Sequence, residues 1–383
     1  MASFNDTLAL FTSADDSVKV LFAKMYLSIQ EASHCFVDAE YYTSFLGVIL
    51  TIFHLTVLTR KSMRTSSVMS IMILIAICDL ISMIIAIATR SIVQNFQSQD
   101  CTPPNSLFVA HFYSVIFTVR DDAIRCSTWL SVSMALLRYI VIKNAAVNGG
   151  VQRISTFRFG FSVAGVLFLF STLLSYVFFL KFDIVITGIW KPAEYCPTYL
   201  TSQPIYGTII SSMFTNNNGF LLKVFSLLNG FSSNILPCIM FPVLTALLIF
   251  KLRVVQSNRK QSAAPHSESK KLVFFRVLTL DLELSIDCRT DRFTGLVIFI
   301  SITFFLAFLP SGIVTSLEAL YTDVGFMYMS FYIHAICSAL LTLNATIHCF
   351  ICYAMSSQYQ NAVRGLLRIS KKSVSHAVSQ NQP

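Results

Sequence analysis

Seven long apolar segments constrain this chain more than any other feature of its sequence. Each approaches the roughly 20 residues that an α-helix needs to cross the hydrocarbon core of a bilayer. Only 12% of the residues are charged, against about 25% in a soluble domain. Since helices satisfy their own backbone polar groups in lipid, the sequence predicts an all-α membrane protein, a seven-transmembrane helix bundle. The expected spans are residues 41–58, 68–88, about 106–143, 159–180, 224–250, 295–317 and 326–353.

The charges of the loops predict how this bundle lies in the membrane. Lysine and arginine collect after the first, third, fifth and seventh spans, whereas the segment before the first span is acidic. Positively charged loops stay in the cytosol, so we expect a multi-pass plasma-membrane protein with the N-terminus outside and the C-terminus inside. This distribution also accounts for the net charge of +9 without a nucleic-acid partner.

The chain divides into three expected parts around this bundle. Residues 1–40 form an extracellular segment with a glycosylation sequon at Asn5, residues 41–353 form the seven-helix domain, and residues 354–383 form a cytosolic tail. The cytosolic loop 251–293 contains an odd half-apolar stretch, 272–288, whose four charges make it a poor membrane span. This stretch could extend the sixth span as a cytosolic helix or be an insertion.

The tail after the seventh span has the pattern of a short amphipathic helix. Tyr359, Ala362 and Val363 recur at helical spacing, with Arg364 and Arg368 on the opposite face. Such a helix is expected to lie on the inner leaflet of the membrane. The alternative is a frayed tail without stable structure.

Ten cysteines are present, and only Cys35, Cys101 and Cys196 fall on the expected outer side, where disulfides persist. Cys101 precedes the third span and Cys196 lies in the long loop after the fourth. A Cys101–Cys196 disulfide would tie this loop over the outer mouth of the bundle. Since Cys35 makes the number odd, a bond from Cys35 to either of the other two stays open as an alternative.

Charged residues inside the apolar spans mark the candidate functional positions. A charge at membrane depth is costly, so it faces the bundle interior, pairs with another charge or reaches the interface. Asp79 is the one charge of the second span, and Arg138 lies near the end of the third. Asp79 can be a functional acid or a hydrogen-bonded structural one, and an isolated Arg138 could extend its side chain to the interface. The outer half of the third span holds the densest charge, in Arg120, Asp121, Asp122 and Arg125.

Several stretches together resemble a known receptor family. These are FHLTVLTRKSMRTSSVMSIMILIAICD at 53–79, TWLSVSMALLRYIVIK at 128–143, LPCIMFPVLTALLI at 236–249, FFLAFLPSGI at 304–313 and TLNATIHCFICYAMSSQY at 342–359. The chain resembles a rhodopsin-like G-protein-coupled receptor, and within that superfamily the nematode serpentine receptor class W, chemoreceptors allied to FMRFamide and myosuppressin receptors. The resemblance covers about residues 41–368, apart from the insertion.

The resemblance implies roles for residues at the inner end and in the middle of the bundle. Arg138 and Tyr139 match the positions that engage a heterotrimeric G protein, although Leu137 replaces the acid that usually precedes the arginine. Asp79, Ser127 and Asn344 match an interior switch that holds a sodium ion in this superfamily, so an interior sodium ion is a possible bound group. We expect no other cofactor and no other metal.

The resemblance also implies an extracellular ligand site. Arg120 and Asp121 lie where this superfamily contacts ligands, and Phe308 stands in place of a tryptophan. With Arg125 of the same charged group, these are the candidate ligand-binding residues. Arg120 occupies the position of the aspartate of amine receptors, which argues against a monoamine. An acid beside a base suits a peptide with its own charges, such as an FMRFamide-like neuropeptide, or a chemosensory small molecule. The alternative is that the charges of the third span neutralise one another.

Other classes of membrane protein fit the sequence less well. A transporter is expected to have repeated halves with broken helices, and a channel is expected to have rings of charge or carbonyl-rich loops. The chain has neither, nor does it have a metal-binding, phosphate-binding or nucleophile motif. The prediction is therefore a receptor and not an enzyme, with a polytopic transporter or channel as the alternative.

Overall fold

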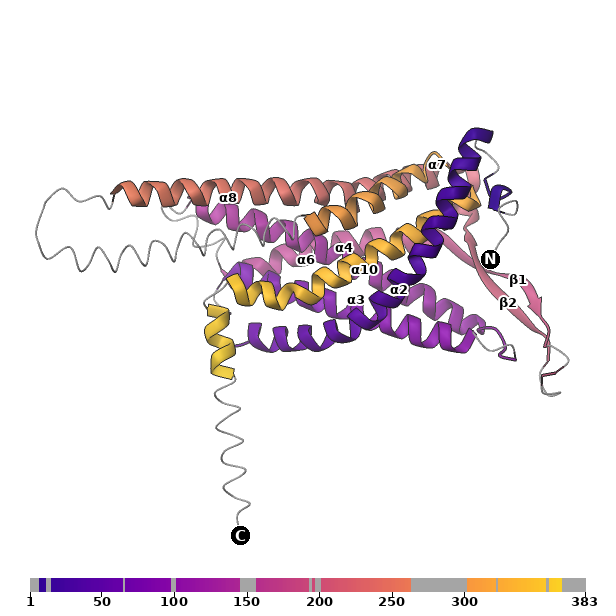
Figure 1. Ribbon diagram of the computed structural model, residues 1–383, viewed down its shortest axis with the longest axis horizontal. Coiled ribbons are helices and arrows are strands. Elements are labelled where there is room, and N and C mark those ends of the chain that lie inside the picture. Colours follow the sequence, from indigo (N-terminus) through magenta and orange to yellow (C-terminus); the bar gives the residue numbers. More distant parts are fainter. Residues whose placement is uncertain are drawn as a thin grey trace, which may run out of the picture.

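The computed structural model describes residues 7–11, 15–64, 66–97, 101–144, 156–192, 195–196, 201–262, 302–321, 323–355 and 358–366. Its long helices run side by side as one bundle (Figure 1). The sequon at Asn5 and the insertion 272–288 lie outside the described residues. The helices are α2 (Asp16–Leu58), α3 (Ser67–Gln97), α4 (Leu107–Asn144), α6 (Phe157–Leu180), α7 (Ser212–Asn229), η1 (Gly230–Ile235), α8 (Leu236–Ser262), the helix Ile302–Leu317 and α10 (Val324–Met355).

Each predicted span has a helical counterpart, so the prediction of an all-α membrane protein is confirmed. Among the described residues, five helices are long and apolar enough to cross a bilayer. The helix Ile302–Leu317 is apolar but shorter, and the start of its predicted span lies outside the described residues. Helix α4, which corresponds to the third span, is more polar because its N-terminal half carries four charged residues.

The first helix begins at Asp16, well before the predicted start at residue 41. Its early half packs with residues 7–11 against the N-terminal end of α10 and the C-terminal end of the helix Ile302–Leu317. Phe11 is fully buried there, and the Gly325 N–H donates to the carbonyl of Leu10 at 3.1 Å. A Cβ at Gly325 would lie 2.8 Å from Cζ of Phe11, so this contact requires glycine. We call residues 7–11 and 16–40 the N-terminal cap.

The fifth span is a continuous helix with a wider turn in its middle. Helix α7 passes through the π-helical η1 into α8, and η1 ends two residues before Pro237. A proline ring clashes with the carbonyl four residues earlier in a regular α-helix, and a π-helical turn relieves that clash. The wider turn presents Ser233 toward the bundle interior, where this side chain is buried.

A two-stranded antiparallel hairpin connects α6 to α7, and the sequence did not predict it. Strand β1 (Phe182–Trp190) pairs with β2 (Gln203–Ile210), with a bulge between Ile186 and Gly188. The expected disulfide between Cys101 and Cys196 is present, with a Cα–Cα distance of 5.5 Å, and Cys35 is free and exposed. The disulfide therefore joins the start of α4 to the segment between the two strands.

Residues 358–366 form the predicted helix of the tail, and its apolar face packs against the protein. Tyr359, Ala362 and Val363 are buried against Val57, Leu58, Met63 and Ile73. The hydroxyl of Tyr359 is hydrogen-bonded to Nδ1 of His54 at 2.9 Å, and burial raises the pKa of the Tyr359 phenol above its ordinary value. The turn between α2 and α3 provides an apolar surface that the sequence alone could not place beside this helix.

The two ends of the bundle carry different structures. The N-terminal cap and the hairpin β1–β2 lie at one end, and the helix of residues 358–366 lies at the other (Figure 1). This arrangement is the one that an odd number of spans requires.

Phe11→Ala is expected to lower the thermal unfolding midpoint of the detergent-solubilised protein. Loss of a fully buried phenylalanine costs about 3–5 kcal/mol in other proteins. Phe108→Ala is the matched control, since Phe108 is 79% exposed. Equal midpoints for the two variants would contradict the packing of the N-terminal cap.

Tyr359→Phe is expected to destabilise the protein by about 1 kcal/mol, the net contribution of one hydrogen bond, because His54 is buried and loses its partner. Tyr353→Phe serves as the control, since Tyr353 is 42% exposed. Thermal unfolding in detergent measures both variants. A Tyr359→Phe protein as stable as the control would argue against the contact between the tail helix and α2.

Candidate functional site

Helix α4 carries the candidate site residues and is packed against α3, α6 and α8. Its polar side chains form three groups along its length. The first is the charged stretch from Arg120 to Arg125 in its N-terminal half, the second is Ser127 with Asp79 of α3, and the third is Arg138 at the opposite end. The core between α4, α8 and the helix Ile302–Leu317 is apolar.

Arg120 forms a buried ion pair with Glu40, a residue that the sequence analysis did not single out. Oε1 of Glu40 also accepts hydrogen bonds from Ser338 at 2.8 Å and Thr342 at 3.0 Å, and Arg120 donates to Ser338 at 2.7 Å. The Arg120 side chain is 15% exposed and that of Glu40 is 8% exposed. This group joins α2, α4 and α10. The only feature of the sequence that pointed to this group is the acidic residue directly before the first apolar span.

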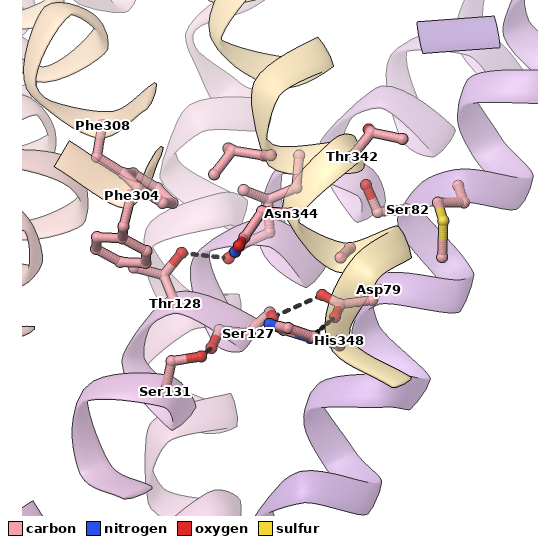
Figure 2. Close-up of a pocket in the computed structure, with 14 residues that line it drawn as sticks. Asp79, Ser82, Ser127, Thr128, Ser131, Phe304, Phe308, Thr342, Asn344 and His348 are labelled. Carbon is pink, nitrogen blue, oxygen red and sulfur yellow. Dashed lines mark hydrogen bonds and ion pairs between the residues drawn. The ribbon is translucent and has the colours of Figure 1, made fainter. Parts of the chain in front are cut away.

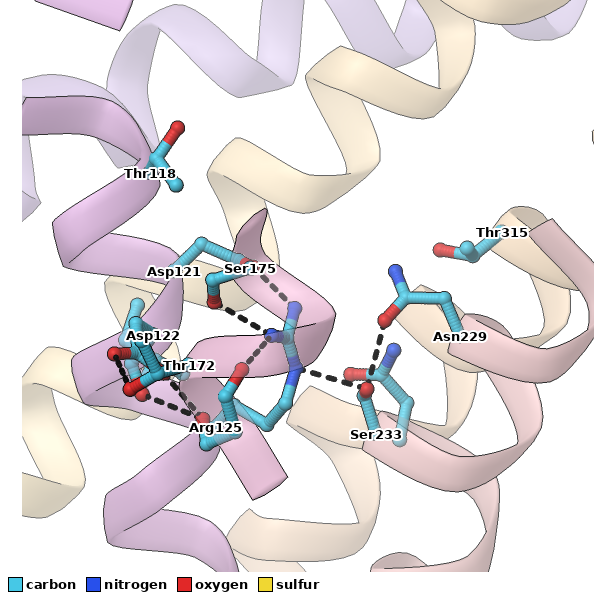
Figure 3. A network of polar contacts seen from close by, with 12 residues as sticks. Thr118, Asp121, Asp122, Arg125, Thr172, Ser175, Asn229, Ser233 and Thr315 are labelled. Carbon is cyan, nitrogen blue, oxygen red and sulfur yellow. Dashed lines mark hydrogen bonds and ion pairs between the residues drawn. The ribbon is translucent and has the colours of Figure 1, made fainter. Parts of the chain in front are cut away.

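Arg125 is the centre of a second buried network, drawn in Figure 3. Its side chain, 2% exposed, pairs with Asp121 and donates to Ser175 Oγ at 2.7 Å and Ser233 Oγ at 2.9 Å. A further bond to the carbonyl of Ser171 measures 3.3 Å. Because Ser171 and Ser175 belong to α6 and Ser233 to η1, one guanidinium holds α4, α6 and the wide turn of the fifth span together.

The remaining acid of the group faces α6. Asp122 accepts hydrogen bonds from Ser171 Oγ at 2.5 Å and Thr172 Oγ1 at 3.0 Å. All four charged residues of this half of α4 therefore have partners within the protein. The Asp121 side chain has 37% of its surface exposed, against 15% for Arg120 and 2% for Arg125. Asp121 therefore keeps accessible surface that the two arginines lack.

A further ion pair lies at the same end of the bundle. Lys181 Nζ, just after α6, is 3.2 Å from Glu318 Oε2, just after the helix Ile302–Leu317. Ser330 of α10 donates to the other oxygen of Glu318 at 2.6 Å. This pair links the end of α6 to the helix Ile302–Leu317 and α10, which are distant from α6 in sequence. No sequence pattern indicated it, because Lys181 and Glu318 both fall in loops.

Phe308 lies in the apolar core and not on an open surface. It is 3% exposed and packs against Phe304 with ring centroids 4.4 Å apart. It also lines the interior cavity beside Asp79. A ligand reaching Phe308 would therefore have to enter the bundle to that depth.

The interior cavity brings together the residues expected to form the switch. Figure 2 shows Asp79 of α3, Ser127 of α4 and Asn344 and His348 of α10 around it, and its volume is about 40 Å³. Ser127 donates to Asp79 Oδ1 at 2.7 Å, and His348 Nδ1 lies 3.2 Å from Asp79 Oδ2. Asn344 Oδ1 is buried and has no hydrogen-bond partner among the described residues. Sequence reasoning missed His348 as the partner of Asp79.

We tested whether these residues fit a sodium ion. A hard cation requires several oxygen lone pairs directed at one point. The cavity wall has oxygen atoms, but the group nearest Asp79 Oδ2 is a ring nitrogen of His348. A nitrogen that close to a carboxylate carries a hydrogen, which repels a cation. With His348 in this position the residues do not fit a sodium ion.

Arg138 lies at the end of α4 opposite the charged half. Its Nη2 is 3.9 Å from Met72 Sδ, and it forms no ion pair with any carboxylate in the described parts of the chain. Leu137, at the position where the superfamily has an acid, is buried. Beyond it, the ammonium of Lys143 lies 5.9 Å from the centre of the Tyr139 ring. The absence of an adjacent acid, expected from the sequence, leaves this guanidinium without an intrahelical partner.

Comparisons with known proteins agree with this architecture. The G-protein coupled receptor dmsr-1 of Caenorhabditis elegans is 25% identical over 222 residues, which is 56% of this chain and 42% of that relative. The match thus spans less than half of the relative's length. The model of the family described as serpentine type 7TM GPCR chemoreceptor Srw matches residues 38–370, and the chain belongs to this family.

Proposed function

We propose that this protein is a G-protein-coupled receptor of the plasma membrane that converts binding of an extracellular ligand into activation of a heterotrimeric G protein. The observation that carries the proposal is the position of Arg138, a cation at one end of α4 with no acidic partner among the described residues. Membership of the Srw family supports it. Nothing in the structure favours the transporter or channel considered as alternatives.

The mechanism is a shift between two arrangements of the bundle. A ligand that binds one arrangement more tightly favours it by the difference in its two affinities. The fifth span offers a place for such a change, because η1, Pro237 and Pro242 interrupt its regular hydrogen bonding. Pro310 does the same in the helix Ile302–Leu317. Movement of the inner halves of these two helices would open the surface around Arg138 and Tyr139 to a G protein.

The ligand we propose is a peptide with a basic group, such as an amidated FMRFamide-like peptide. Arg120 and Arg125 are both neutralised by carboxylates of the chain. Asp121 keeps 37% of its side chain exposed, so it is the candidate contact for a cation of the ligand. A small chemosensory cation would use the same carboxylate. In this proposal the N-terminal cap and the hairpin β1–β2 face the extracellular side.

Arg138→Ala is expected to abolish agonist-stimulated G-protein dissociation, because it removes the guanidinium that would contact the G protein. Surface expression should stay at the wild-type level, since Arg138 holds no ion pair among the described residues. Arg64→Ala is the control, an exposed arginine in the turn after α2. Full signalling by Arg138→Ala at normal surface expression would exclude the assigned role.

Asp121→Asn is expected to raise the concentration of agonist that gives half-maximal response by about 10- to 100-fold, as expected for loss of a charged hydrogen bond. The agonist would come from a screen of amidated peptides read out by G-protein dissociation. Asp122→Asn is the matched control, because Asp122 faces the hydroxyls of Ser171 and Thr172 and its amide can still accept from them. Unchanged potency in Asp121→Asn, with surface expression equal to the control, would rule out Asp121 as the ligand contact.

A further inference from the structure

We propose that His348 occupies the place beside Asp79 that a sodium ion would need, so that the chain joins α3 to α10 with its own side chain and binds no sodium there. The inference concerns the interior of the bundle alone. It does not depend on the identity of the ligand or of the G protein.

The hydrogen positions in this contact follow from its chemistry. A carboxylate can only accept hydrogen bonds, so Nδ1 of His348, 3.2 Å from Asp79 Oδ2, must carry a hydrogen. This holds whether the ring is neutral or charged. The hydroxyl of Ser127 donates a hydrogen bond to the other carboxylate oxygen, Oδ1, at 2.7 Å. Both oxygens of Asp79 therefore already face hydrogens from the chain, in the positions where a bound cation would have to approach them.

The rest of the cavity has the oxygen atoms that a cation would use. Asn344 Oδ1 is buried without a hydrogen-bond partner among the described residues and lines the same cavity as Asp79 (Figure 2). A buried orphan acceptor in a native protein calls for a bound donor or ion. The hydroxyls of Ser82, Thr128 and Ser131 also line the wall. The cavity thus has oxygen atoms that could bind a cation, but His348 fills the space beside the carboxylate of Asp79.

Removing the imidazole should therefore create a sodium site. His348→Ala frees Asp79 Oδ2 and adds the volume of the ring to a cavity of about 40 Å³. A ligand that binds only the folded state stabilises it by RT ln(1 + [L]/Kd), where [L] is the free ligand concentration and Kd the dissociation constant. Sodium binding can then be measured as a rise of the unfolding temperature, and no agonist is needed.

The experiment compares the thermal unfolding midpoint of the purified full-length protein in sodium chloride and in choline chloride, each at about 150 mM. We expect equal midpoints for the wild type in the two salts. For His348→Ala we expect a midpoint about 2 °C higher in sodium, the shift expected when the sodium concentration is about ten times the dissociation constant of the site. Adding Asp79→Asn to this variant should remove the difference.

His348→Asn provides a second variant should the alanine protein not fold, because asparagine retains a polar side chain and contributes an oxygen. It is expected to respond to sodium as His348→Ala does. A sodium-specific rise in the wild type that Asp79→Asn abolishes would overturn the proposal, since the ion would then bind with His348 present. Folded His348 variants that ignore sodium would overturn it equally, because the imidazole would not be what keeps the ion out.

Discussion

The cost of placing charge in a bilayer is the constraint on which this structure depends. Helix α4 carries four charged side chains in its N-terminal half, and each of them has a partner within the protein. Those partners come from α2, α6, η1 and α10, so neutralising the charges also fixes where four neighbouring segments lie. A buried pair contributes little to net stability, but removing one partner leaves an uncompensated charge that costs about 3–5 kcal/mol. The charges therefore act mainly to specify which helices meet, and apolar packing supplies the stability.

A line of polar residues on α10 connects the charged group to the interior cavity. Ser338 and Thr342 donate to Glu40, the partner of Arg120, and Thr342 also lines the cavity that contains Asp79. His348, further along α10, contacts Asp79 itself. A ligand that changed the position of Arg120 would thus act on the same helix that holds Asp79. Packed networks of this kind can carry coupling where the elements they join have two arrangements, and the π-helical turn held by Arg125 is the element here most suited to change.

The sequence predicted the helices better than it predicted their ends and partners. Apolar runs located every span, because length and hydropathy are local properties. The start of α2 at Asp16 was missed because its early half is amphipathic and is stabilised by residues 7–11 and by α10, which are distant in sequence. The hairpin and η1 were missed for similar reasons. Asp79 and Ser127, which the resemblance singled out, are hydrogen-bonded to each other. The contacts of Glu40 and His348 depend on which helices are neighbours, and no local pattern encodes that.

The contacts in the structure distinguish charged residues that are available for binding from charged residues whose contacts are already made within the bundle. Arg125 was a candidate for ligand binding because charges at membrane depth are usually functional, yet all its contacts are made within the bundle. Arg138 was a weaker candidate by that rule, since it lies near a helix end, but it has no acidic partner among the described residues. A charge in a membrane span is thus informative only once its partners are known. Glu40 is the partner of Arg120, and His348 is the partner of Asp79. An external ion or ligand that binds one of these charges must displace the partner that the chain supplies. The energy of that internal contact sets the affinity that the ion or ligand would need.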